Sequence, residues 1–193
     1  RTIKPRATRA ASILALAAAM AIPAMAQQPL PAPPRQVAQP NAALIYWPAW
    51  VQISQDTAEK LRAIDWTQVG SAVDVSSLPE AYRDAAKMDT LFSVAEDLVR
   101  ASKAPRCDFE IRYDDGFMAI LPHLSKSRDG ARLLRLAAHQ RLTQGNADGA
   151  AAYVAALARG AQQVSGDRVL ISSLVGFATA TSACEETAAV LAA

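Results

Sequence analysis

Residues 119–166, AILPHLSKSRDGARLLRLAAHQRLTQGNADGAAAYVAALARGAQQVSG, decide the fold class of this chain. Apolar residues recur at helical spacing on both sides of Gly145-Asn146-Ala147, which predicts helices over about 119–144 and 148–164. A connection this short leaves the second helix no path except back along the first. We therefore expect an antiparallel helical hairpin whose second helix ends near Gly166.

The last predicted helix starts after Asp167 and carries a regular apolar stripe. The members recur every three or four residues and are Leu170, Leu174, Phe177, Thr181, Cys184, Ala188 and Leu191. Small residues would let neighbouring helices approach closely, and they include Ser173, Gly176, Ala180 and Ala183. The uncharged stretch over 169–184 has 16 residues, whereas a membrane span needs about 20. We expect a buried helix.

Shorter helices are predicted ahead of the hairpin. Asn41 can cap a first helix, which Pro48 should end or kink because its ring clashes with the preceding turn. Asp56 followed by Glu59 marks the start of a second helix, which ends near Trp66.

A third helix has the strongest start signal, since Ser77 and Glu80 can satisfy opposite ends of one exposed turn. Its predicted core face consists of Leu78, Tyr82, Ala85, Met88, Phe92, Ala95 and Val99. The expected fold over residues 41–193 is therefore all-α, a helical bundle or stacked antiparallel helical hairpins with one short extended segment.

The hairpin resembles a tetratricopeptide-type unit, because Leu134, Ala138, Gly145 and Ala150 have that family's spacing. It departs from the pattern where Val154 replaces the aromatic residue and Gln162 the closing proline. The resemblance implies stacked hairpins, although such repeats usually need about three units.

The longer segment over 107–175 resembles uncharacterised exported bacterial helical proteins. Its matching stretches are Leu121-Pro122-His123-Leu124 and Leu170-Ile171-Ser172. This resemblance implies no particular activity.

The first 26 residues have the pattern of an export signal. Four basic residues precede an uncharged run over 10–22, and Ala24-Met25-Ala26 matches the pattern that signal peptidase cleaves. The alternative is a transmembrane anchor, but Pro23 interrupts a run that is already shorter than about 20 residues. We expect a mature protein that begins at Gln27, is exported to the periplasm or the extracellular space, and has no stable membrane span after cleavage.

Residues 27–40, QQPLPAPPRQVAQP, are a predicted proline- and glutamine-rich linker, and a polyproline ligand for another domain is the alternative. Removing the signal leaves 16 basic and 18 acidic residues, a net charge of −2. Without a dense basic run, nucleic acid is excluded as a partner. The folded domain is predicted over 41–193, and its helix-like last residues leave a C-terminal truncation open.

Residues 107–116, CDFEIRYDDG, break the helical pattern and alternate apolar with polar side chains, as an extended segment with one buried side does. The candidate catalytic residues in and after it are Asp108, Glu110, Asp114, Asp115 and His123. Carboxylates beside a histidine can serve as acid/base groups or metal ligands. Their spacing matches no calcium loop and no zinc helix, so we predict no metal site and no cofactor, and a solvated loop explains the same residues.

The two histidines, His123 and His139, lie on one predicted helix. Their separation of sixteen residues corresponds to about 24 Å along a helix, too far to share a metal ion. We expect His123 to pack or hydrogen-bond inside the fold and His139 to face the surface or the hairpin.

The cysteines and a group of aromatic residues are the remaining candidates. Export favours a disulfide between Cys107 and Cys184, and the alternative is that Cys184 is a buried free thiol. The predicted contact surface for a protein partner consists of Tyr46, Trp47 and Trp50, because tryptophan and tyrosine often anchor interfaces. Such residues also commonly cover the end of a bundle.

The leading functional hypothesis is an exported helical interaction or scaffold module. A metal-dependent or acid/base hydrolase that uses residues 108–123 is the second hypothesis, and an N-terminal fragment of a larger exported helical protein is the third. Neither a Gly-x-Ser-x-Gly elbow nor a glycine-rich phosphate loop occurs in the chain, which makes an enzyme the weaker interpretation. The sequence predicts no specific substrate, partner or oligomeric state.

Overall fold

Six α-helices and one 3-10 helix form the part of the chain that the computed structural model describes, residues 39–66 and 89–192. The elements are α2 (Ala43–Val51), α3 (Gln55–Ala63), α6 (Asp89–Ser102), the 3-10 helix η3 (Tyr113–Met118), α7 (Pro122–Thr143), α8 (Ala147–Ser165) and α9 (Leu170–Ala192). The expected all-α fold is confirmed. The predicted signal peptide, the predicted linker up to residue 38 and the predicted helix start at Ser77, with Leu78, Tyr82, Ala85 and Met88, lie outside the described residues.

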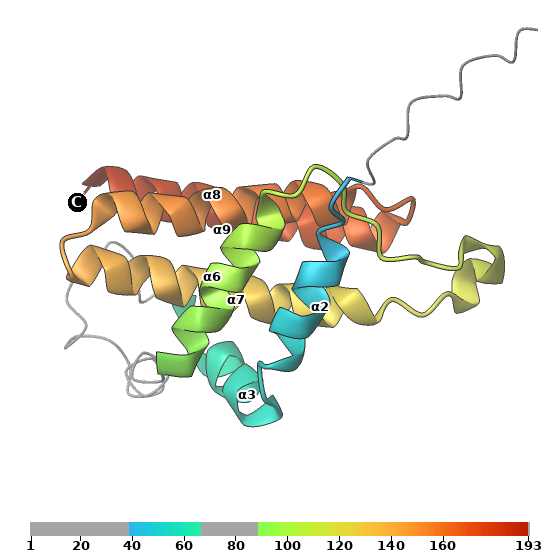
Figure 1. The fold of residues 1–193 in the computed structure, drawn as a ribbon, viewed down its shortest axis with the longest axis horizontal. Helices are drawn as coiled ribbons and strands as arrows, with labels where there is room; N and C mark the ends of the chain where they lie inside the picture. Colours follow the sequence, from blue (N-terminus) through green and yellow to red (C-terminus); the bar gives the residue numbers. More distant parts are fainter. Residues whose placement is uncertain (1–38, 67–88, 193) are drawn as a thin grey trace, which may run out of the picture. The chain divides into compact units, whose positions relative to one another are not determined.

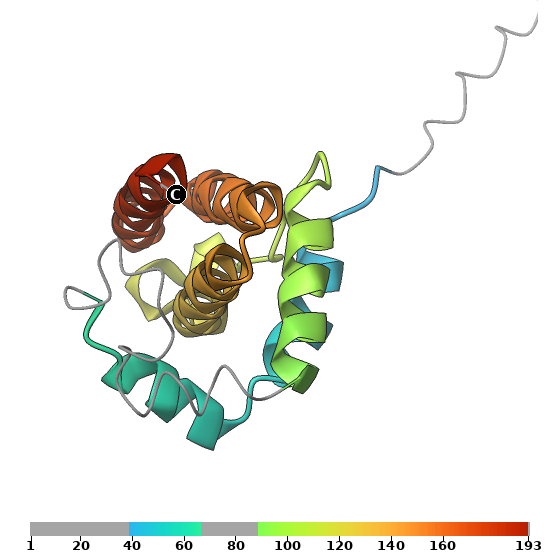
Figure 2. The ribbon, with the colours of Figure 1, turned by 90° about the vertical axis from the view of Figure 1, so that its left-hand side faces the viewer.

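Helices α7, α8 and α9 run side by side, each antiparallel to the one before it (Figure 1). The turn between α7 and α8 is the predicted one, since Gly145 adopts a φ of 68° and Asn146 Oδ1 accepts from Gly149 N at 2.8 Å. Glycine tolerates that left-handed conformation, and an asparagine cap satisfies one exposed donor of the next helix. Helix α9 contacts both α8 and α7, and Figure 2 views the three helices end-on.

The shorter helices cover α7 and α8. Helix α6 contacts α2, α7 and α8, while α3 contacts α7 (Figures 1 and 2). Apolar residues of α6 fill the space between them at three- and four-residue steps, namely Leu91, Val94, Ala95, Leu98 and Val99. Ala95 and Val99 are therefore core residues, as predicted.

Helix α2 does not end at Pro48, one of the two expected effects of this proline, and it continues to Val51. A proline inside a helix costs about 3 kcal/mol or more. The next turn holds Ala49 and Trp50, both buried in the core. Burial of a tryptophan side chain offsets the lost hydrogen bond, so tertiary packing sets the end of α2.

The segment between α6 and η3 forms neither helix nor ladder. Its start is fixed to the beginning of α2 by two hydrogen bonds of 2.9 Å, from Asn41 Nδ2 to the Asp108 carbonyl and from Asp108 N to Asn41 Oδ1. This connection places Phe109 against the core, where its side chain is half-buried.

Candidate functional site

The carboxylates of the predicted catalytic segment lie mostly in solvent. Glu110, Asp114 and Asp115 are exposed, and the Asp115 carboxylate is 3.7 Å from Arg112 Nη2. Asp108 accepts from Glu110 N at 2.9 Å, and this hydrogen bond, with the Arg106 guanidinium, lowers the pKa of the Asp108 carboxyl. Within the described residues no three histidine, cysteine or acidic side chains are grouped as metal ligands.

A shallow groove of about 300 Å³ brings some predicted residues together. Trp47, Glu110, Asp115 and His123 line it, whereas Asp108 and Asp114 do not. His123 is buried, as expected for a packing residue, and its ring stacks on Phe109 with centroids 4.4 Å apart. The groove therefore has one imidazole in its wall and solvated carboxylates at its rim.

Asp167 is the partner of His123 that sequence reasoning missed. It lies in the turn between α8 and α9, and its Oδ2 is 2.8 Å from His123 Nε2. A histidine oriented by a carboxylate can act as a general base when a nucleophile is in reach. The nearby thiol of Cys107 does not supply one, because burial and the carboxylates of Asp167 and Asp108 raise its pKa to about 12.

Tyr46 and Trp50 are core residues, which removes them from the predicted contact surface. Their rings stack with centroids 4.9 Å apart, and Trp50 also stacks on Phe109 at 5.7 Å. Tyr46 Oη donates to Gln163 Oε1 at 2.7 Å, and burial raises the pKa of this phenol. Of the three predicted residues, Trp47 alone stays half-buried.

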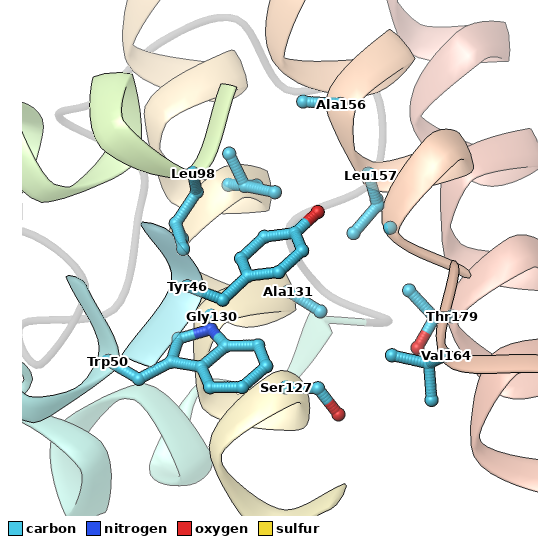
Figure 3. A pocket seen from close by; sticks show the side chains of 12 residues that line it. Tyr46, Trp50, Leu98, Ser127, Gly130, Ala131, Ala156, Leu157, Val164 and Thr179 are labelled. Carbon is cyan, nitrogen blue, oxygen red and sulfur yellow. The ribbon is translucent and has the colours of Figure 1, made fainter. Parts of the chain in front are cut away.

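The cavity beside this stack is small. Figure 3 shows the side chains of Tyr46 and Trp50 next to Gly130 of α7, with Leu157 of α8 opposite. Its volume is about 30 Å³, enough for a water molecule rather than a substrate. The ring of Trp50 needs Gly130, because a Cβ there would lie 2.7 Å from Trp50 Nε1. This region is packing rather than a binding pocket.

A buried ionic cluster joins α7 to α9. Glu186 accepts from Arg135 Nε at 2.7 Å, and its other oxygen is 2.7 Å from His139 Nε2. The Arg135 guanidinium also lies 3.1 Å from the Glu185 carboxylate and over the Trp66 ring, 4.4 Å from its centroid. Burial opposes ionisation of Glu186, but the hydrogen bond from His139 and the charge of Arg135 together keep its pKa below the ordinary value.

His139 is therefore buried, not on the surface as one of the two predicted placements had it. Arg135 and His139 are four residues apart and share one face of α7, so a single carboxylate on the neighbouring helix can contact both. The acidic pair Glu185-Glu186 is the signal in the sequence that could have indicated this cluster.

The apolar stripe of α9 faces solvent, which corrects the expectation of a buried helix. The exposed fractions of its large side chains are 77% for Leu170, 60% for Leu174, 74% for Phe177 and 83% for Leu191. Thr181, Cys184 and Ala188 between them are also exposed. The predicted stripe exists, but it lies on the outer face of the helix.

The small residues on the opposite face of α9 explain why the apolar stripe faces solvent. The inner face of α9 consists of Ser172, Val175, Gly176, Ala183, Glu186 and Ala189. A Cβ on Gly176 would lie 2.8 Å from the Ala161 carbonyl oxygen and would also overlap Ser165 Oγ. The two helices approach so closely there that no larger residue fits, and the larger apolar residues occupy the opposite side.

Both cysteines are free thiols in the structure. Cys184 is exposed on the outer face of α9, and Cys107 is half-buried in the segment after α6. The predicted bridge between them is not formed here, and the predicted burial of Cys184 as a free thiol is not observed.

None of the helices in the described ranges is both long enough and apolar enough to cross a membrane. Family models, curated proteins and solved structures gave no match to this chain.

Proposed function

We propose that this chain is an exported helical interaction module whose contact surface is the outer face of α9. The observation that carries the proposal is the solvent-facing stripe of seven residues from Leu170 to Leu191. Single exposed apolar side chains are common on soluble proteins and need no explanation. Ile120 is of that kind, and α2 exposes a pair, Leu44 and Val51, rather than a stripe along a long helix.

The spacing of the stripe supports a helical partner. Its members are separated by four, three, four, three, four and three residues, the repeat that places side chains in one seam along a helix. These side chains therefore lie along one face over the length of α9, where a second helix can contact all of them. Complete burial of a large apolar side chain contributes roughly 1.5–3 kcal/mol, so four such side chains can hold a second helix.

The hydrolase hypothesis has less support. The acidic residues of the 108–123 segment are mostly exposed, and the one buried histidine there is paired with Asp167. The hypothesis of a larger exported helical protein is compatible with our proposal. In that case the helix that packs on α9 would belong to the same, longer chain rather than to a separate partner.

Site-specific photo-crosslinking in the cell that exports the full chain tests this proposal. A photoreactive amino acid at Phe177 should give a covalent adduct of discrete mass, because a partner covers that position. The same group at Leu44, which is 70% exposed on α2, is the matched control and should give little adduct. Equal labelling at both positions, or no adduct at Phe177, would overturn the proposed function.

A further inference from the structure

We infer that the helix covering α9 is α9 of a second copy of this chain, packed antiparallel about a two-fold axis. This inference rests on the proposed function and names its partner. A two-fold interface uses the same surface on both subunits, so the surface must complement itself. The outer face of α9 meets that requirement in the size and in the charge of its residues.

The sizes of the seam residues are complementary in one antiparallel register. The large residues Leu170, Leu174 and Phe177 occupy the first half of the stripe, and the small residues Thr181, Cys184 and Ala188 follow them. Leu191, the last member of the stripe, is large and lies beyond the paired layers, because its opposite position is residue 167, before the start of α9. In the antiparallel register each of the three large residues of the first half lies opposite a small one. The three layers are Leu170 with Ala188, Leu174 with Cys184, and Phe177 with Thr181.

A parallel pair lacks this fit. Phe177 would then lie opposite Phe177, and Cys184 would lie opposite Cys184, which crowds one half of the seam and leaves space in the other. Cores and interfaces lose stability both from crowding and from empty space. The distribution of side-chain volume along α9 therefore favours the antiparallel orientation.

The charges agree with the same register. No seam residue is charged, so two copies can bring their stripes together without burying an unpaired ion. Arg168 precedes the start of α9 and is exposed, while Glu185 is exposed near its end. Antiparallel pairing in the stated register places these two residues about 8 Å apart along the axis, inside the screening length of about 8–10 Å.

The native Cys184 allows the register to be tested by disulfide crosslinking of the mature full chain. The substitution Leu174→Cys, made in a Cys107→Ser background, should give a covalent dimer under mild oxidation, because position 174 of one copy lies opposite Cys184 of the other. Adding Cys184→Ser should abolish that dimer, since the two copies of position 174 are about 15 Å apart along the axis. The Cys107→Ser background alone should stay monomeric on a denaturing gel.

Sedimentation of the unmodified chain provides the second measurement. We expect a dimer that Phe177→Glu converts to monomer and that Leu44→Glu leaves intact, with helical circular dichroism confirming that both variants fold. Efficient crosslinking through Cys184 alone would overturn the inference in favour of a parallel pair.

A chain that is monomeric at every concentration would also overturn the inference. If photo-crosslinking at Phe177 still gave an adduct in the cell, the proposed function would stand and the partner would be another helix. If that adduct were absent as well, both the inference and the proposed function would fail.

Discussion

Helices α8 and α9 are neighbours in the chain and in space, both are rich in alanine, and they bury opposite kinds of residue. Helix α8 directs Tyr153, Leu157 and Val164 inward. Helix α9 directs one valine, several small residues and a glutamate inward and turns Leu174 and Phe177 to solvent. An apolar stripe therefore indicates that a helix face packs against another surface. It does not show whether that surface belongs to the same chain or to a partner.

The largest effect should come from the charge on the inner face of α9. Glu186→Ala leaves Arg135 and His139 buried without their shared carboxylate, which should lower the free energy of unfolding by about 3–5 kcal/mol. Glu185→Ala is the matched control, because the Glu185 side chain is largely exposed, and it should change stability by about 0–1 kcal/mol. Urea unfolding of both variants measures the difference, and equal losses would show that the inner cluster does not stabilise α9.

The same substitution on each helix compares the two faces directly. Leu157→Ala on α8 should cost about 2–5 kcal/mol, because it opens a cavity in the core. Leu174→Ala on α9 should stay within about 0.5 kcal/mol in dilute solution, since its side chain is mostly exposed there. A large loss for Leu174→Ala in the dilute chain would mean that the outer face already packs within one copy.

The close approach of the two helices predicts a smaller effect at Gly176. A methyl group there meets the Ala161 carbonyl oxygen, and crowding of this kind costs about 1–3 kcal/mol. Gly160→Ala is the control, because its Cβ would be 3.4 Å from Tyr46 Oη and alanine is the better helix former. Thermal melts should place Gly176→Ala below the parent chain and Gly160→Ala at or above it.

The pH dependence should be the most gradual of these effects. The folded pKa of Glu186 lies below its ordinary value of 4.5, so the folded state favours the carboxylate. The stability that this ionisation contributes is present above pH 4.5 and is lost as the pH falls through the folded pKa. Glu186→Gln should therefore lose less stability than the parent chain between about pH 5 and pH 3. A parallel decline of both proteins in acid denaturation would contradict this role of Glu186.

Local signals along the chain predicted most of the helices correctly. Gly145 and Asn146 mark a turn through a left-handed residue and a cap, which are properties of a few adjacent residues. Pro48 was a wrong stop signal, because the burial of Trp50 two residues later depends on contacts far along the chain. The same long-range packing turned two of the three predicted contact residues into core.

The candidate site was harder to predict, because α9 has two stripes at helical spacing. Ser172, Gly176, Ala183, Glu186 and Ala189 are separated by four, seven, three and three residues, so they also share one face of the helix. The choice between the two faces depends on how closely α8 approaches Gly176 and on the partners that Glu186 finds on α7. Neither the approach of α8 nor the partners of Glu186 can be deduced from the sequence of α9 alone.

Thiol alkylation of Cys184 tests most directly whether the outer face of α9 is a covered contact surface. Cys184 lies in the stripe and is exposed, whereas burial raises the pKa of Cys107 to about 12 and makes that thiol unreactive near neutral pH. In cells that express the chain, Cys184 should react with a maleimide at least about tenfold more slowly than in the purified, diluted protein. Equal rates in the two settings would contradict the account, because they would show that nothing covers α9.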